Sequence, residues 1–270
     1  QAYEQSHADL LDADDCPALQ FVERYADTYA KIRAPKDASP RIAVFSAIVG
    51  AYDDMKEPAV PVDGVDFFMF TDGAVPPGSV WQKRDLEYVD ADPTRSARFV
   101  KTHPHLYFAH YDYAIWIDAN LTLNAHPRDM LAMINADKPV HSWKHPLRIC
   151  VFEEARTCME LNKDGIETVQ SDLERLHAEK FPRHAGLIET SVMVTTMAHP
   201  DVPKLYNEWW ARIDAGSRRD QLSLPPALRA TGAEIGYIAP ERICMRTDPR
   251  IIYERHIHNE RELLLQGKAA

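Results

Sequence analysis

The sequence lacks several patterns that define common protein classes. No apolar run approaches the 18 residues of a membrane-spanning helix, so no membrane span is predicted in this chain. The cysteines form no CxxC pair and no cysteine–histidine cluster with zinc-finger spacing. Neither GxGxxG nor a P-loop of the form GxxxxGKS/T occurs, which argues against dinucleotide binding and P-loop chemistry.

The chain also has no excess of positive charge. Its 31 Lys and Arg residues face 41 Asp and Glu residues, which gives a formal net charge of −10 at pH 7. This balance argues against nucleic acid as the main partner, although a local basic patch or a metal can still bind an anionic small molecule. The four cysteines are scattered, at positions 16, 150, 158 and 244, which predicts free thiols in a reducing compartment such as the cytoplasm; the alternative is a single disulfide.

What the sequence does contain is an alternation of apolar strands and amphipathic helices. The run at residues 42–49 is almost wholly apolar, as expected for a strand buried on both faces of a sheet. The alternation predicts an α/β fold with a mainly parallel central sheet flanked by helices. Strands are expected at 42–49, 65–70, 81–89, 113–117, 140–143, 187–195 and 234–238, and helices at 16–32, 95–110 with a break at Pro104, 128–136, 153–162, 166–179, 203–215 and 221–230.

The most informative segment is the strand at residues 113–117, which ends directly at Asp118. Ligands of α/β sheets bind outside the carboxyl ends of the strands, so Asp118 is a candidate site residue. Asn120 follows two positions later, and two oxygen-bearing side chains at this spacing can share a divalent cation that also contacts a diphosphate. The segment resembles the Asp-x-Asp motif of nucleotide-sugar glycosyltransferases. The alternative is a strand end followed by an ordinary turn.

Two further strand ends carry candidate binding residues. The first strand is followed by Gly50 and Ala51, whose small size lets the backbone approach a ligand, and then by Tyr52, which could stack on a nucleobase. Asp72 follows the second strand and could accept hydrogen bonds from a base or a ribose. For both Tyr52 and Asp72 the alternative is a plain turn.

Three basic residues recur at intervals of three in the helix before Asp118. Arg95, Arg98 and Lys101 are expected along one flank of this helix. Because cationic side chains pair well with phosphate oxygens, the stripe predicts a contact with a diphosphate. The alternative is a solvated face, but the helix leads directly into the strand that ends at Asp118, which favours the functional interpretation.

Two carboxylates are candidates for acid–base chemistry. Glu189 interrupts the apolar run GLIETSVMV, where a buried carboxylate is costly unless it is paired or meets a ligand; alternatively it faces outward on an edge strand. Asp220 is a candidate general base for an acceptor hydroxyl, with a helix N-cap as the alternative. His256 and His258 could complete the ligand shell of Mn²⁺ or simply lie exposed in a charged tail.

Taken in order, these segments resemble a known family. The blocks are IVGAYDD, FFMFTDG, Trp81, RSARFVKTHPHLYFAHYDYAIWIDANLTL, HPLRICVFEEA, GLIETSVMV and EWWARIDAGSRRDQLS. Over residues 41–237 they look like the glycosyltransferase-like family of plant mucilage- and turgor-related proteins and bacterial polysaccharide-locus proteins, and KTHPHLYFAHYDYAIWIDAN is the most specific stretch. The resemblance implies a GT-A-like (Rossmann-like) fold, a nucleotide-sugar donor and usually a divalent metal, Mn²⁺ or Mg²⁺.

The resemblance also implies roles for individual residues. Tyr52 and Asp72 correspond to the nucleoside pocket, Lys101 to the diphosphate contact, and Asp118 and Asn120 to the metal and diphosphate motif.

The catalytic end of the family site maps onto the later blocks of the sequence. Asp220 and Gln221 resemble the Asp-Gln pair that faces donor sugar and acceptor in several GT-A enzymes. This chain departs from the common motif at Asn120, because a neutral amide binds a hard cation less strongly than the usual second Asp. His256 or His258 is a candidate to compensate.

These observations predict a glycosyltransferase that moves a sugar from a nucleotide-sugar donor to a glycan or glycoconjugate acceptor. We expect it to act in bacterial surface polysaccharide synthesis, in the cytoplasm or at the inner face of the membrane. If transfer inverts configuration, a base such as Asp220 is needed near the acceptor hydroxyl; if it retains configuration, Asp220 or Glu189 has another role. The alternatives are a non-catalytic carbohydrate-binding domain on the same fold and a hydrolase that pairs Glu189 with Asp220.

The expected domain organisation follows from the same blocks. Residues 1–40 are predicted to be an N-terminal helical extension and linker, residues 41–250 the GT-A-like catalytic domain, and residues 251–270 a tail. Residue 1 is Gln rather than Met, and no signal-peptide pattern follows it. We therefore expect the chain to be either a domain excised from a longer polypeptide with other domains or a trimmed form of the protein.

Overall fold

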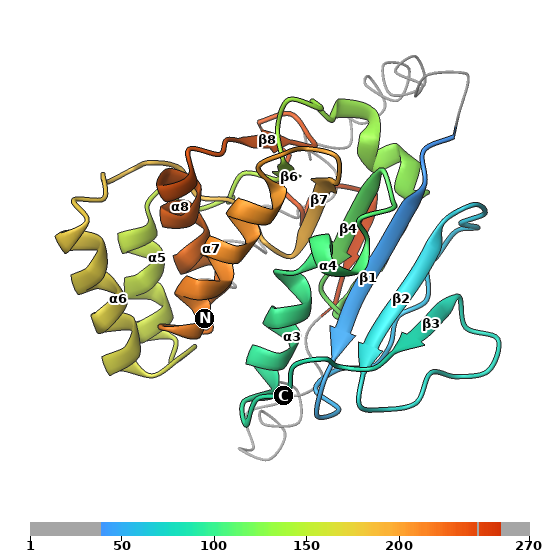
Figure 1. Ribbon diagram of the computed structural model, residues 1–270, viewed down its shortest axis with the longest axis horizontal. Coiled ribbons are helices and arrows are strands. Elements are labelled where there is room, and N and C mark those ends of the chain that lie inside the picture. Colours follow the sequence, from blue (N-terminus) through green and yellow to red (C-terminus); the bar gives the residue numbers. More distant parts are fainter. Residues whose placement is uncertain (1–38, 242, 255–270) are drawn as a thin grey trace, which may run out of the picture.

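A seven-stranded sheet forms the centre of the protein, in a computed structural model that describes residues 39–241 and 243–254 (Figure 1). The strand order is β3–β2–β1–β4–β7–β6–β8, and β5 and β9 form a separate two-stranded sheet. The strands span Ile42–Ile48 (β1), Asp66–Thr71 (β2), Trp81–Arg84 (β3), Tyr113–Ile117 (β4), Leu121–Leu123 (β5), Val140–Ser142 (β6), Val192–Thr196 (β7), Ile235–Tyr237 (β8) and Ile251–Tyr253 (β9).

Helices connect the strands and cover the sheet. Strand β1 pairs in parallel with β2 and β4, β2 with β3, and β6 with β8, whereas β7 runs antiparallel to both of its neighbours. The predicted α/β fold with a mainly parallel sheet flanked by helices is therefore confirmed. The helices span Pro93–Lys101 (α3), Pro104–Tyr107 (α4), Pro127–Met133 (the 3₁₀ helix η1), Val151–Glu160 (α5), Ile166–Ala178 (α6), Val202–Asp214 (α7) and Asp220–Thr231 (α8).

Strand β1 shows why the sheet is buried on both faces. All of its residues are buried, as the apolar run predicted. Because successive side chains of a strand point to opposite faces, Ala43 and Phe45 join one apolar cluster while Ile42 and Val44 join another. The central strands therefore have no solvated face, and polar groups for a site must come from the strand ends.

One face of the sheet is covered by α3, α4 and α7 (Figure 1). The ring centroids of Phe45 and Trp116 lie 5.4 Å apart in an edge-to-face contact, and Trp209 of α7 is fully buried in the same cluster. The opposite face is covered by η1 and the β5–β9 pair, through residues such as Met130 and Ile251. A third apolar cluster lies among α5, α6 and α8. Within the described residues, no helix combines the length and apolar character needed to cross a bilayer.

Several predicted elements differ from the observed ones at their ends. The break predicted at Pro104 is confirmed, because Pro104 has no N–H to continue α3 and begins α4 instead; the two helices together start earlier, at Pro93, and end earlier, at Tyr107, than the expected 95–110. The strand expected at 187–195 is shorter: β7 begins at Val192, and Glu189 N donates to Trp143 O at 2.9 Å outside the strand. The segment 128–136 is largely a 3₁₀ helix, and the strand expected at 81–89 ends at Arg84. The helix expected at 16–32 lies outside the described residues.

The parallel strands β1, β2 and β4 end at one edge of the sheet, and the loops there are tied together. Gly50 has a φ of +66°, a left-handed conformation that favours glycine. Its N–H lies 3.0 and 3.2 Å from the two carboxylate oxygens of Asp72. A Cβ at position 50 would also come within 3.2 Å of the Pro93 ring. The loop after β1 is therefore fixed to the end of β2 and the start of α3.

Candidate active site

Asp118 lies at the carboxyl end of β4, where the sequence pattern placed it. Its Oδ1 accepts a hydrogen bond from Trp116 Nε1 at 2.7 Å and lies 3.4 Å from Lys101 Nζ and 3.9 Å from Arg98 Nη1. Trp116 is 2% exposed, so it holds the carboxylate from inside the core. Among the described residues, the second oxygen of Asp118 has no hydrogen-bond partner and remains available to a ligand.

Lys101 is the centre of the charged cluster. Its side chain is fully buried, and its ammonium group contacts the carboxylates of both Asp118 and Asp220. Arg98 Nε lies 3.6 Å from the same oxygen of Asp220. A buried ammonium group is stable only when it is paired, so these contacts fix α3, the end of β4 and the start of α8 relative to one another. Four predicted site residues are thus brought together from three separate elements.

Asp220 is held as a carboxylate by this cluster. Burial alone would raise its pKa, but the charges of Arg98, Lys101 and Arg219 outweigh burial and hold the pKa well below its usual range. The Asp220 side chain is 3% exposed. A carboxylate that is paired with Lys101 and has such a low pKa is a weak base, so its environment fits the positioning of Lys101 better than proton transfer.

Glu189 is the opposite case. The residue is 6% exposed, and among the described residues no hydrogen bond or ion pair engages its carboxylate. Burial raises the pKa of Glu189 to about 7; Glu154 and Asp118 add to this rise, and Arg246 and Arg148 oppose it. A carboxyl group that titrates near neutral pH beside the charged cluster can both accept and release a proton.

Gln221 links the chain segments that carry these two carboxylates. Its Nε2 donates to the carbonyl oxygen of Ile188 at 3.2 Å, one residue before Glu189. On the other side, the carbonyl oxygen of Asp220 accepts a hydrogen bond from Trp209 Nε1 at 3.0 Å. The first turn of α8 is therefore anchored in the core and supports the segment that carries Glu189.

Arg95 does not join the charged cluster, contrary to the prediction of a three-residue basic stripe. Its guanidinium donates at 2.6 Å to the carbonyl oxygens of Ile213 and Gly216, at the C-terminal end of α7. The reason is helical geometry: three residues turn a helix by only 300°, so residues 95 and 101 differ in direction by about 120°. Arg98 and Lys101 remain close enough to converge, whereas Arg95 caps a neighbouring helix.

The two candidates for nucleoside binding lie in the loops after β1 and β2. Tyr52 is 39% exposed, and its hydroxyl lies within electrostatic reach of Arg98, Arg218 and Arg219, which places it close to the charged cluster. Burial is the main reason that the pKa of Tyr52 is raised. Asp72 is exposed and accepts the Gly50 N–H, which gives it a structural role in the loop.

Asn120 has a structural role, because it forms hydrogen bonds with the residue after β9. It is 4% exposed, its side-chain Nδ2 donates to Glu254 O at 2.9 Å, and its backbone carbonyl oxygen accepts from Glu254 N at 3.0 Å. The end of β9 is therefore fastened two residues beyond Asp118. His256 and His258 lie outside the described residues, just past this point in the sequence.

Further charged residues surround the site, and sequence reasoning missed one of them, Lys163. Arg219 lies next to Asp220, and Lys163, after α5, lies within electrostatic reach of both Arg219 and Glu154. Arg148 Nε donates to Glu154 at 2.5 Å. Arg148 and Glu154 stand in one polar stretch before α5 and in its first turn, whereas Lys163 follows α5 and no local spacing marks it.

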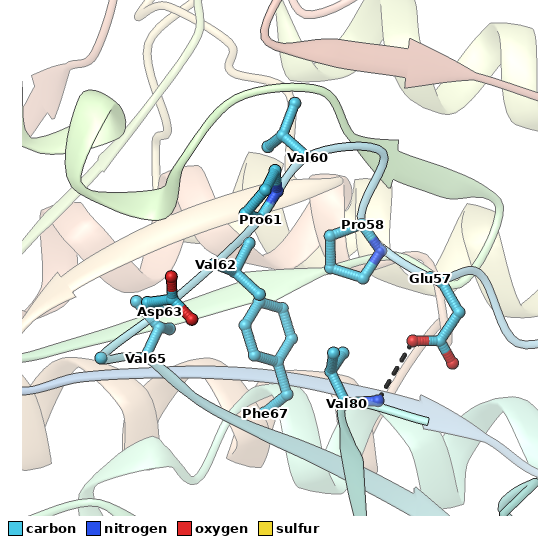
Figure 2. A pocket seen from close by; sticks show the side chains of 10 residues that line it. Glu57, Pro58, Val60, Pro61, Val62, Asp63, Val65, Phe67 and Val80 are labelled. Carbon is cyan, nitrogen blue, oxygen red and sulfur yellow. Dashed lines mark hydrogen bonds between the residues drawn. The ribbon is translucent and has the colours of Figure 1, made fainter. Parts of the chain in front are cut away.

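A separate surface pocket of about 430 Å³ lies away from these residues (Figure 2). It is formed by the loop at residues 57–65 together with Phe67 and Val80, near the amino ends of β2 and β3. Figure 2 shows apolar side chains around it, with Val80 N donating to a Glu57 carboxylate oxygen at 3.2 Å. None of the predicted site residues lines this pocket.

Comparison with known proteins identifies the family. No curated protein matches the chain. Among solved structures, the apo form of the bifunctional glycosyltransferase WbbM is similar, with 8% sequence identity and a TM-score of 0.45. The match covers 76% of this chain and 40% of the WbbM chain, so this chain spans less than half of the length of WbbM. A family model for the TOD1/MUCI70 glycosyltransferase-like domain matches residues 79–234, more than half of the chain, which includes α3, Asp118, Glu189 and Asp220. The chain belongs to the TOD1/MUCI70 glycosyltransferase-like domain family.

Proposed function

We propose that this chain is a glycosyltransferase that transfers a sugar from a nucleotide-sugar donor to the hydroxyl group of a glycan or glycoconjugate acceptor. The observation that carries the proposal is the convergence of Arg98, Lys101, Asp118 and Asp220 at the carboxyl edge of the sheet. This edge is where α/β sheets bind ligands, and fixed cations there complement a diphosphate. Family membership favours the same chemistry.

The donor would lie across the ends of β1, β2 and β4. Tyr52 offers a partly exposed ring for stacking on a base, and Arg98 and Arg219 supply positive charge for the diphosphate. Lys101 is buried beneath Asp118 and orients it. The Gly50–Asp72 contact keeps the loop after β1 in place.

The donor set at Asp118 fits a divalent cation in part. Its second carboxylate oxygen is available, and Asn120 contributes an amide oxygen while its Nδ2 is bonded to Glu254. His256 and His258 lie outside the described residues, and we keep them from the sequence as candidates for the remaining ligands. A bound Mn²⁺ or Mg²⁺ would neutralise charge on the departing nucleoside diphosphate.

Glu189 is the residue we assign to proton transfer, in place of Asp220. The acceptor oxygen forms a bond to the anomeric carbon while the bond from that carbon to the diphosphate oxygen breaks, and the hydroxyl proton passes to the Glu189 carboxylate. A base with a pKa of about 7 suits this step, whereas Asp220 is too acidic and is bound to Lys101. Direct displacement of this kind inverts the configuration of the transferred sugar.

The two other functions considered are less well supported. A hydrolase would need two carboxylates free to act on the sugar, and the Asp220 carboxylate is paired with Lys101 and held ionised. A purely carbohydrate-binding domain gives no reason for a buried carboxyl group without a hydrogen-bond partner, because such a group is costly unless a ligand uses it. We place the transferase in surface polysaccharide synthesis, in the cytoplasm or at the inner face of the membrane, as the family resemblance implies.

Calorimetry with UDP- and GDP-sugars, with and without Mn²⁺, tests the proposal. We expect one nucleotide to bind, more tightly with Mn²⁺, and Asp118→Asn to lose the metal-dependent part because an amide is a weaker metal ligand. The control is Asp112→Asn, a half-exposed carboxylate before β4 whose loss should change nothing. Absence of nucleotide binding in every condition would remove the transferase proposal and leave the carbohydrate-binding alternative.

A further inference from the structure

A second group of metal-ligating side chains lies outside the charged cluster, on α5 and the loop after α6. Cys150, Glu153 and His184 each offer one ligand atom, and these three atoms lie within 4.8 Å of one another. We propose that they form a zinc site, distinct from the site at Asp118.

Local structure explains how the three residues meet. Cys150 is the N-cap residue of α5, and Glu153 follows three residues later, so both lie on the same turn of the helix. His184 approaches from the loop after α6, and its Nδ1 lies 4.0 Å from Glu153 Oε1. Arg183 anchors that loop, with its guanidinium carbon 5.3 Å from the centre of the Phe152 ring.

Backbone pairing holds the two segments in register. Gly186 N donates to Ile149 O at 3.0 Å, and His145 N donates to Leu187 O at 2.9 Å. Cys150 directly follows this antiparallel pairing on one segment, and His184 closely precedes it on the other. The ligands therefore come from two chain segments whose separation is already fixed.

The chemistry of the three side chains favours zinc. A thiolate, an imidazole and a carboxylate are the usual zinc ligands, and in a tetrahedral site their donor atoms lie roughly 3.4–3.6 Å apart. The Glu153 and His184 side chains are 41% and 53% exposed, so they can rotate to close the remaining distance. Cys150 is fully buried beneath them, which leaves the fourth position to water on the solvent side. One thiolate and one carboxylate balance the charge of Zn²⁺.

The site would act on the segment that carries Glu189. Four residues separate His184 from Glu189, and the chain between them is paired with residues 143–149. A zinc ion would fasten the far end of this segment to α5, because it would add a fixed link where Glu153 and His184 now approach only to 4.0 Å. The link would restrict the loop without contacting the charged cluster.

Titration of the metal-free chain with Zn²⁺, monitored by competition with a chromophoric chelator, tests this site. We expect His184→Ala and Glu153→Gln each to weaken the tightest binding by at least about tenfold, because each removes a direct ligand. The matched control is His110→Ala, an exposed histidine before β4 that should leave the affinity unchanged. Equal affinity in the wild type and the His184→Ala variant would overturn the proposal.

Cobalt substitution identifies the thiolate. Co²⁺ bound at this site should give a sulfur-to-cobalt charge-transfer band that is absent from Cys150→Ser and present in Cys244→Ser. Because Cys150 is buried and its substitution can perturb folding, the band is also measured in His184→Ala, where it should shift or weaken. A band that survives in Cys150→Ser, or no band in the wild type, would show that the three residues do not bind metal together.

Discussion

The two buried carboxylates of the site, Asp220 and Glu189, experience opposite electrostatic surroundings. Asp220 contacts Lys101 and lies near Arg98 and Arg219, so its pKa is held below its usual range despite burial. Glu189 is equally buried, but its nearest influences include the carboxylates of Glu154 and Asp118, and its pKa rises to about 7.

Burial therefore does not by itself decide what a carboxylate does. In a site of low polarity the sign of the neighbouring charges determines whether the group stays ionised or becomes available for proton exchange. The side of the cluster formed by α3 and α8 is compensated and rigid. The side that leads into β7 has an uncompensated carboxyl group, which is typical of a group reserved for a substrate.

The largest effect on stability and activity is expected when Lys101, the buried cation between Asp118 and Asp220, is removed. Lys101→Met would leave Asp118 and Asp220 without their buried partner, which we expect to cost about 3–5 kcal/mol of stability as well as activity. Urea unfolding measures the change. In the double variant Lys101→Met/Asp220→Leu much of the stability should return while activity stays absent. If the double variant is no more stable than the single one, Lys101 does not act through Asp220.

Removing the carboxylate of Glu189 should have the opposite effect, a loss of activity without a loss of stability. Glu189→Gln is expected to lower kcat by about 10²–10⁴-fold, because the amide cannot accept a proton. Its stability at pH 8 should equal or exceed that of the wild type, because a poorly solvated carboxylate is removed. Steady-state kinetics and thermal unfolding of the same sample measure both. A large loss of stability with modest loss of activity would make Glu189 structural.

The pH dependence of stability should separate the two groups. For Glu189 the folded-state pKa is above the unfolded value, so its contribution is fully present below about pH 4.5 and is lost as the pH rises to about 7, by about 1.4 kcal/mol per unit of pKa shift. For Asp220 the folded pKa is lowered, so its contribution is present above the unfolded value and is lost as the pH falls below about 4. Urea unfolding across this pH range measures the free energy of unfolding. In Glu189→Gln, only the fall of this free energy between pH 4.5 and 7 should disappear.

Activity should follow the titration of Glu189 in the opposite direction. Below about pH 7 the protonated carboxyl group cannot accept a proton, so kcat should fall by about tenfold per pH unit, and above pH 7 it should level off. A profile that stays flat down to pH 5 would return the role of base to a more acidic group such as Asp220.

The smallest effect is expected from substitution of Arg95. This substitution distinguishes a residue that caps α7 from one that contacts the ligand. Arg95→Ala should cost about 1–2 kcal/mol, because the carbonyl groups at the end of α7 lose a charged donor. The KM for the donor should not change. Arg98→Ala, one turn later, should raise that KM. A higher KM for the donor in Arg95→Ala would show that Arg95 contacts the diphosphate, as the predicted basic stripe implied.

Much of the fold could be predicted because its signals are local. The apolar run of β1 and the break at Pro104 follow from side-chain polarity and from the missing N–H of proline. The start of the strand expected at 187–195 was misplaced. Leu187 and Ile188 are apolar like the strand itself, but the hydrogen bonds of this stretch go to the segment at residues 143–145. The β5–β9 pair was missed, since its short strands lie 130 residues apart.

The sequence by itself determined the α/β alternation and the position of Asp118, because strand burial and a polar strand end are written in consecutive residues. Only the tertiary structure decided how the charges are distributed. It directed Arg95 to α7, paired Lys101 with Asp220 across 119 positions, and left Glu189 without a counter-charge in direct contact. The physical reason is that pKa values and ion pairs depend on distance and burial, which residues far apart in the chain establish only when they pack together.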